Sequence, residues 1–154
     1  MKKLITAAML LLSVGCFAQI SQIEKAPEQK IVGKIAPMGS FIAELTWSPM
    51  SERPQDSTYT LMFRNQKFKT LNEREYVIFL GVEGTFGQLY GVFKSVFAPE
   101  NKSNKDYMVS FKLGNTDVTI AHYQTMGIVG AMFMAKNAYV VLTESQVDKL
   151  FGKN

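Results

Sequence analysis

The sequence predicts an α+β domain with a mainly antiparallel, curved sheet of about seven or eight strands, one central amphipathic helix and a short C-terminal helix. Two observations predict this class. A fully apolar run, Tyr76–Leu80, leads into a stretch with helical periodicity, and several other short segments alternate between apolar and polar residues and are separated by turn residues. Alternation with a period of two is typical of strands that have one buried face.

The Tyr76–Leu80 run is apolar at every position. A strand with two apolar faces is typical of the middle of a sheet that is covered on both sides. After the Gly81–Gly84 turn, large apolar residues recur three or four positions apart, which places them on one side of a helix. This stripe consists of Phe86, Leu89, Tyr90, Phe93 and Phe97, and Pro99 ends the helix. The sequence therefore predicts a central strand that feeds a helix lying against a sheet.

Further strands are expected before this central strand. Lys30–Ala36 and Gly39–Ser48 are predicted as the first two, joined at Pro37, and Thr58–Arg64 as the third. A short additional strand is expected at Lys67–Leu71. In the second and third strands apolar residues alternate with polar ones, which predicts that each strand has one buried face.

Two hairpins are expected in the second half of the chain. Tyr107–Leu113 alternates regularly, Gly114–Asn115 supplies a turn, and Val118–His122 continues on the return strand. The second hairpin joins Val129–Ala135 to Ala138–Leu142. Together they predict an antiparallel C-terminal half.

A short helix closes the sequence. Thr143 and Gln146 have the spacing of a capping box, which satisfies free backbone donors at a helix start. The apolar side of this helix consists of Val147, Leu150 and Phe151, and Gly152 ends it. We expect this helix to dock against the domain, because an isolated helix of one or two turns is unstable in water.

The two halves show a weak internal similarity. Tyr76–Leu80, followed by Leu89–Gly91, resembles Tyr139–Leu142, followed by Leu150–Gly152. One interpretation is a duplicated architecture in which each half has several antiparallel strands and a helix. The alternative is an irregular α+β domain in which two strand–helix joints are alike by chance.

Residues 1–18 have the pattern of a secretory signal peptide. Two lysines precede the apolar segment Leu4–Val14, and the small residues that follow predict cleavage between Ala18 and Gln19. We therefore expect a bacterial protein exported to the periplasm or the outside of the cell. The alternative is a membrane-anchored lipoprotein, because Val14–Cys16 resembles the end of a lipobox and Cys16 would carry the lipid.

The expected mature chain has a polar leader at 19–29 and a single domain at 30–154. Cys16 is the only cysteine, so this domain would have no disulfide, no thiolate nucleophile and no sulfur metal site. Without the two lysines of the signal peptide, 15 basic and 13 acidic side chains give a net charge of +2. This balance argues against a nucleic-acid partner, and no apolar stretch of the mature chain is long enough for a transmembrane helix.

Several motifs have a chemical and a structural interpretation. The loop glycines Gly81, Gly84 and Gly87 precede a helix, as in phosphate sites, but their spacing fits no nucleotide fingerprint. His122 is the single histidine, with Ser110 and Asp117 as possible partners across the hairpin for general-base catalysis. One histidine does not make a typical zinc site, so a packed or rim position is the favoured interpretation. We therefore predict no catalytic residue, metal or cofactor.

Two further patterns favour structural roles. Glu73 and Glu75 share a strand face, but glycoside chemistry needs two carboxylates across a cleft. Phe63–Arg64 and Lys67–Lys69 mix aromatic and basic residues, as single-strand binders do, but the run is short and the net charge small. Both are interpreted as solvated parts of strands.

The mature chain is rich in aromatic residues and methionine, with 17 aromatics and seven methionines. Such side chains form adaptable apolar sites. The expected apolar pocket comprises Phe86, Tyr90, Phe93, Met132 and Met134. The leading hypothesis is a non-catalytic envelope domain that binds an apolar small molecule or a protein. The alternatives are a small hydrolase that uses His122 and an assembly protein whose sheet edge pairs with a partner.

Overall fold

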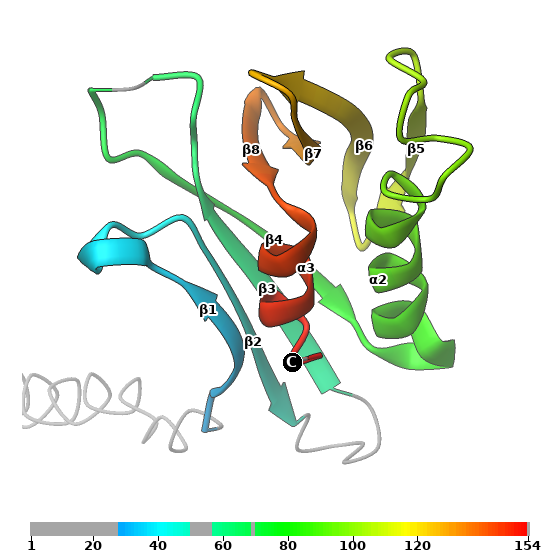
Figure 1. The fold of residues 1–154 in the computed structure, drawn as a ribbon. Coiled ribbons are helices and arrows are strands. Elements are labelled where there is room, and N and C mark those ends of the chain that lie inside the picture. The colour runs from blue at the N-terminus through cyan, green and yellow to red at the C-terminus, as the bar shows by residue number, and fades with distance from the viewer. Residues whose placement is uncertain (1–27, 50–56, 69, 154) are drawn as a thin grey trace, which may run out of the picture.

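The structure of the protein is a computed structural model that describes residues 28–49, 57–68 and 70–153 of the 154-residue chain. The expected signal peptide, Cys16 and residues 19–27 of the expected leader lie outside the described residues. The described residues form eight strands and two α-helices, which are arranged as in Figure 1.

The first four strands form one antiparallel sheet in the order β1-β2-β3-β4, which we call sheet A. Their bounds are Lys30–Ile35 for β1, Ala43–Pro49 for β2, Ser57–Arg64 for β3 and Arg74–Leu80 for β4. A short 3-10 turn at Val82–Gly84 then leads into helix α2, Thr85–Ser95.

The last four strands form a second antiparallel sheet in the order β5-β6-β7-β8, which we call sheet B. Their bounds are Met108–Leu113 for β5, Thr116–Thr125 for β6, Ile128–Ala135 for β7 and Ala138–Leu142 for β8, and α3 follows at Glu144–Leu150. The predicted α+β class, the antiparallel pairing and both helices are confirmed. The strands form two sheets of four, however, where one curved sheet was expected.

The two halves of the domain have the same order of elements, four consecutive strands and then a helix. The sequence similarity between the Tyr76 and Tyr139 segments therefore falls on equivalent elements, since β4 precedes α2 and β8 precedes α3. In space the helices change sides: α2 stands beside β5, and α3 lies over sheet A, where it contacts β1 and β2 (Figure 1). Each half thus covers part of the other.

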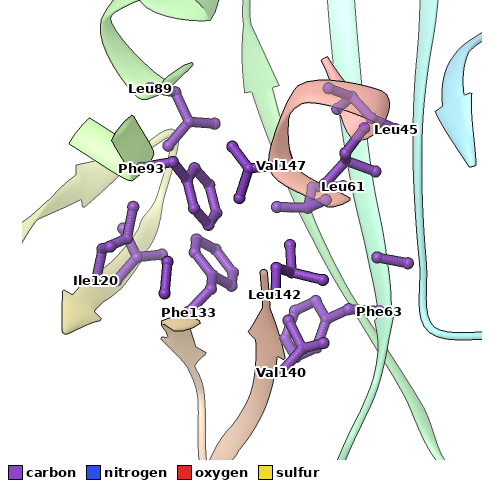
Figure 2. Close-up of a cluster of buried hydrophobic side chains, with 14 of the residues drawn as sticks. Leu45, Leu61, Phe63, Leu89, Phe93, Ile120, Phe133, Val140, Leu142 and Val147 are labelled. Atoms are coloured by element: carbon purple, nitrogen blue, oxygen red, sulfur yellow. The ribbon is translucent and has the colours of Figure 1, made fainter. Parts of the chain in front are cut away.

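The predicted helix stripe faces the interior. Leu89 and Phe93 are buried, and Phe86 and Tyr90 are partly buried against the core. The ring of Phe93 stacks on Phe133 of β7, with centroids 5.8 Å apart. Phe133 in turn meets Phe63 of β3 edge-on at 5.4 Å. Figure 2 shows these rings in one apolar cluster with side chains from both sheets and from α3, so the stripe connects the two sheets.

The C-terminal helix begins as predicted. The Thr143 side chain accepts a hydrogen bond from the Gln146 backbone, and the Gln146 side chain accepts one from the Thr143 backbone at 2.9 Å, which forms a capping box. Val147 and Leu150 are buried, which confirms that α3 docks. Its last turn lies so close to β1 that a β-carbon at Gly33 would collide with backbone carbonyl atoms of α3.

The position of β4 in its sheet differs from the predicted one. β4 is the last strand of sheet A, at its edge, and only its inward residues Val77 and Phe79 are buried. The outward side chains of Tyr76, Ile78 and Leu80 are 53%, 49% and 45% exposed. The prediction of a central strand covered on both faces is therefore wrong, because the chain leaves sheet A after β4 to enter α2.

The prediction of a short strand at Lys67–Leu71 is also wrong, because the described residues of this segment form no strand. The chain just before it is held by sheet B instead: the Gln66 backbone donates to the Tyr139 carbonyl at 2.9 Å. The Gln66 side-chain oxygen accepts from the Val141 backbone at 3.0 Å. These bonds attach the chain just after β3 to the edge of β8 in sheet B.

The second strand begins at Ala43, four residues later than expected. Met38 and Gly39 adopt left-handed backbone conformations, with φ of 50° and 79°, in a turn that starts at Pro37. A left-handed residue cannot continue a strand, so pairing with β1 starts only after this turn.

Candidate functional site

A groove lies between α2 and the edge strand β5, with a volume of about 290 Å³. Its lining residues are Thr85, Gln88, Leu89 and Val92 from α2 and Val109, Phe111, Lys112 and Leu113 from β5. The two elements meet here because the inward face of β5 and the apolar side of α2 both join the core.

The floor of this groove is apolar. Leu89 and Leu113 are each 2% exposed and close its base, and Val92, Val109 and Phe111 are partly exposed along it. Partial exposure of branched and aromatic side chains in a hollow favours binding of an apolar group, because burial releases water from their surfaces.

The edge of β5 supplies free backbone groups along the same groove. The His122 backbone N–H donates to the Tyr107 carbonyl at 2.8 Å. Because hydrogen-bonded residues alternate along an antiparallel pair, the register places the backbone bonds of Val109 and Phe111 towards β6 as well. The N–H and C=O groups of Met108, Ser110 and Lys112 point the other way, and no hydrogen bond between described residues occupies them. An added strand could pair with these three residues.

The groove is almost free of charge. Lys112 is its one ionisable lining residue, and its ammonium lies 3.3 Å from Asp117. Both side chains are largely exposed, so this ion pair is weak. The arrangement favours an uncharged, extended ligand over an ionic one.

Comparison with protein-family models, with curated proteins and with solved structures found no match.

Larger hollows have less suitable linings. The hollow beside the start of α3 has a volume of about 520 Å³ and includes the polar residues Thr143, Glu144 and Ser145. Its acidic groups are already engaged, since Lys94 lies 2.5 Å from Glu144 and 3.1 Å from Asp148. Another hollow, of about 440 Å³, includes the charged side chains Lys67, Asp117 and Lys136.

His122 is packed, as its place in the hairpin predicted. It is 7% exposed, and its Nε2 lies 3.0 Å from the Lys102 carbonyl oxygen, which can accept a hydrogen bond from it. The Ser110 hydroxyl is bonded to Thr119 at 2.8 Å, and Asp117 pairs with Lys112. Ser110 and Asp117 lie on the opposite face of the hairpin from His122, so the structure does not bring these three together.

The five residues of the expected apolar pocket are divided between two places. Phe86, Tyr90 and Phe93 lie around Phe151, with ring centroids 5.2 to 5.7 Å from it. Met132 and Met134 flank Phe133 on β7, so they point to the opposite side of sheet B. The aromatic residues thus form core, and the methionines lie on the outer face of the sheet.

The other motifs are also dispersed. The backbone at Gly81 lies so close to the ring of Tyr59 that a β-carbon there would collide with it. Gly84 adopts a φ of 76°, and a β-carbon there would meet no atom within 4 Å. Glu73 accepts a hydrogen bond from Asn65 at 3.0 Å, and Glu75 lies 3.5 Å from Lys136.

The basic and aromatic residues form separate local contacts, among them Lys67 over the Phe68 ring at 5.7 Å. In the described part of the chain no group of three or more His, Cys, Asp or Glu residues could hold a metal ion.

A polar cluster joins the two helices beside the core. The Tyr90 hydroxyl donates to Asp148 at 2.9 Å, and Lys94 bridges Asp148 and Glu144. The hydrogen bond to Asp148 raises the pKa of Tyr90 above its usual 10.0. The hydrogen bond to Glu144 raises the pKa of Lys94 above 10.5. Both groups therefore hold their protons more tightly in the folded protein than in the unfolded chain.

This cluster predicts a loss of stability in alkali. A group whose pKa is higher in the folded protein than in the unfolded chain stabilises the fold while it is protonated in both states. This stabilisation is fully present below the unfolded-state pKa, near pH 10, and is lost as the pH rises through the folded-state pKa. We expect the thermal midpoint of the wild type to fall above about pH 10, and that of Tyr90→Phe to fall less steeply. In Asp148→Asn the Tyr90 absorbance titration should move to lower pH. An unchanged titration would contradict the assigned hydrogen bond.

Proposed function

We propose that this chain is an exported, non-catalytic cell-envelope domain that binds an extended apolar segment of a protein partner. The segment adds as a strand to the edge of β5, and its alternate side chains enter the groove beside α2. The observation that carries the proposal is the coincidence of a strand edge that no other described strand pairs with and an apolar groove along the same strand.

The size of the groove supports a polypeptide over a small molecule. Sites for small molecules usually enclose roughly 300–1,000 Å³, and this groove of about 290 Å³ falls just below that range. A few apolar side chains of an extended segment need less enclosed space, because the backbone hydrogen bonds along the strand edge contribute the remaining affinity.

The location is supported by the signal-peptide pattern of residues 1–18. Lipidation at Cys16 would keep the same domain at the membrane surface. Among the described residues, no helix combines the length and apolar character that crossing a membrane requires.

A charge placed in the groove tests the proposal. Val109→Asp puts a carboxylate on the groove floor, and we expect it to weaken binding of short peptides of alternating valine and threonine by at least about 30-fold. Binding can be followed by calorimetry on the exported form. Val141→Asp is the matched control, since Val141 is also a partly exposed strand valine but lies on β8, away from the groove.

Circular dichroism of both variants would verify folding. Equal loss of peptide binding in the two variants would contradict the site. Saturable binding of an apolar dye to the wild type, with no binding of any peptide, would favour a small apolar ligand instead.

A further inference from the structure

A hollow of about 370 Å³ lies on the outer face of sheet B, apart from the groove at β5. Its lining residues are Tyr123 and Thr125 from β6, Tyr139 and Val141 from β8, Arg64 at the end of β3 and Gln66 just after it. Tyr139 and Val141 flank the buried Val140, so their side chains point away from the core. The volume falls within the roughly 300–1,000 Å³ that is usual for small-molecule sites.

A glycine in β7 keeps the space between β6 and β8 open. Tyr123 pairs across the strands with Gly130, so β7 contributes no side chain to this row of the outer face. A β-carbon at Gly130 would lie only 2.6 Å from Cγ1 of Val141. Glycine inside a strand often marks a place of close approach, here by the side chain of Val141. Tyr123 and Val141 therefore border the hollow with no β7 side chain in that row between them.

The amide of Gln66 is held in one orientation beside β8. Its side-chain oxygen accepts a hydrogen bond from the Val141 backbone at 3.0 Å, and its backbone N–H donates to the Tyr139 carbonyl at 2.9 Å. Because the oxygen of the amide is engaged, the NH2 group is the part that can donate to a ligand in the hollow.

The lining offers hydrogen-bond acceptors as well as donors. In the described part of the chain, no hydrogen bond engages the hydroxyls of Tyr123, Tyr139 and Thr125. The N–H and C=O of one strand residue point to the same side, so the carbonyl of Val141 points towards Gln66, as its N–H does. The hydroxyls both donate and accept, whereas the amide NH2 only donates and the carbonyl only accepts.

The hollow has little charge. Among the described residues that line it, Arg64 is the only charged one, and its Nη1 lies 3.4 Å from the Ser40 hydroxyl oxygen. Two further cations nearby lie over aromatic rings. Arg74, which pairs with Arg64 across the strands, lies 4.4 Å from the ring of Phe41. The ammonium of Lys67 lies 5.7 Å from the ring of Phe68.

We propose that this hollow binds one sugar unit of a neutral oligosaccharide. A sugar hydroxyl donates and accepts hydrogen bonds at the same time, so it matches a lining of mixed donors and acceptors. The apolar C–H face of a sugar ring can pack on the rings of Tyr123 and Tyr139, whose hydroxyls remain able to bond.

Other ligand classes match this lining less well. A carboxylate only accepts hydrogen bonds, so it would leave the Val141 carbonyl without a donor. A purely apolar molecule would displace water from the Gln66 amide and the tyrosine hydroxyls and give no hydrogen bond in return. The hollow is separate from the groove at β5, so the proposal does not depend on the peptide-binding function.

Calorimetric titration of the purified exported protein with maltotriose, cellotriose and tri-N-acetylchitotriose tests the proposal. We expect at least one of these sugars to bind saturably at millimolar concentration. Tyr123→Ala removes the ring on which the sugar packs and is expected to weaken binding by at least about 10-fold. Gln66→Glu keeps an oxygen for the Val141 N–H, removes the amide donor and is expected to weaken binding by about 5-fold or more. The matched control is Tyr76→Ala, which removes an exposed tyrosine of β4 outside the hollow and should leave binding unchanged.

Each alternative result has a defined meaning. Failure of all three sugars to bind at millimolar concentration would overturn the proposal, and so would binding of the anionic trigalacturonate alone. Equal weakening by Tyr123→Ala and Tyr76→Ala would place the site elsewhere. Loss of sugar binding in Val109→Asp would move it to the groove at β5. Circular dichroism verifies folding, and Gln66→Glu decides the result if Tyr123→Ala does not fold.

Discussion

Phe133→Ala is expected to lower the free energy of unfolding by about 3–5 kcal/mol, the largest effect of any single truncation proposed for this chain. Phe133 is fully buried and contacts the rings of both Phe63 in sheet A and Phe93 in α2. Removing its ring leaves a cavity at the place where three elements meet, and rigid sheets close such a cavity only in part. Urea unfolding followed by fluorescence of the single tryptophan, Trp47, measures the change.

The neighbouring residue supplies the control. Met134→Ala removes a large side chain from the same strand, but from the outer face of sheet B, and is expected to cost about 1 kcal/mol or less. A loss from Met134→Ala as large as that from Phe133→Ala would contradict the assignment of the two faces of β7.

Gly33→Ala is expected to cost about 3 kcal/mol, because it adds a single carbon where β1 meets the last turn of α3. The new β-carbon would collide with the carbonyl oxygens of Lys149 and Leu150. Backbone atoms cannot turn aside as a flexible side chain can, so α3 must move away from sheet A and give up part of the burial of Val147 and Leu150. Thermal unfolding and amide exchange of α3 measure both effects.

A glycine-to-alanine substitution on α2 should instead raise the stability of the protein. A β-carbon at Gly91 meets no atom within 4 Å, and alanine is a better helix former than glycine. Gly91→Ala is therefore expected to stabilise the protein by about 0.5–1 kcal/mol. Destabilisation by Gly91→Ala, or a neutral effect of Gly33→Ala, would show that the packing of the two helices is assigned wrongly.

Local patterns predicted the elements well. The alternation from Tyr107 to Leu113, the Gly114 turn and the capping box at Thr143 each depend on neighbours in sequence, and each is present in the structure. The helix stripe was predicted for the same reason, because a period near 3.6 places Phe86 and Phe93 on one side of a helix.

The arrangement of the elements in space was harder to predict from the sequence, because it depends on contacts between distant segments. Two apolar faces on Tyr76–Leu80 indicated a central strand, but no local pattern reveals that the sheet ends there. Gly33 carries no sequence signal of its contact with α3, which is more than 100 residues away.

The candidate groove was missed for a related reason. The alternation of Tyr107–Leu113 predicted a strand, which is confirmed, but the sequence did not show that β5 lies at an edge beside α2. A signal was present in the polar connector before Tyr107, since it forms no strand, and among the described strands only β6 pairs with β5. The methionine-rich segment of β7 drew attention instead, because composition does not distinguish the two faces of a strand.

Amide hydrogen exchange along β5, measured with and without bound peptide, shows whether a peptide adds as a strand at this edge. In the free protein, the amides of Met108, Ser110 and Lys112 should exchange quickly, and those of Val109 and Phe111, which bond to β6, should exchange slowly. Bound peptide should protect the first three amides and leave the other two nearly unchanged. Saturable binding without this alternating protection would contradict strand addition at β5.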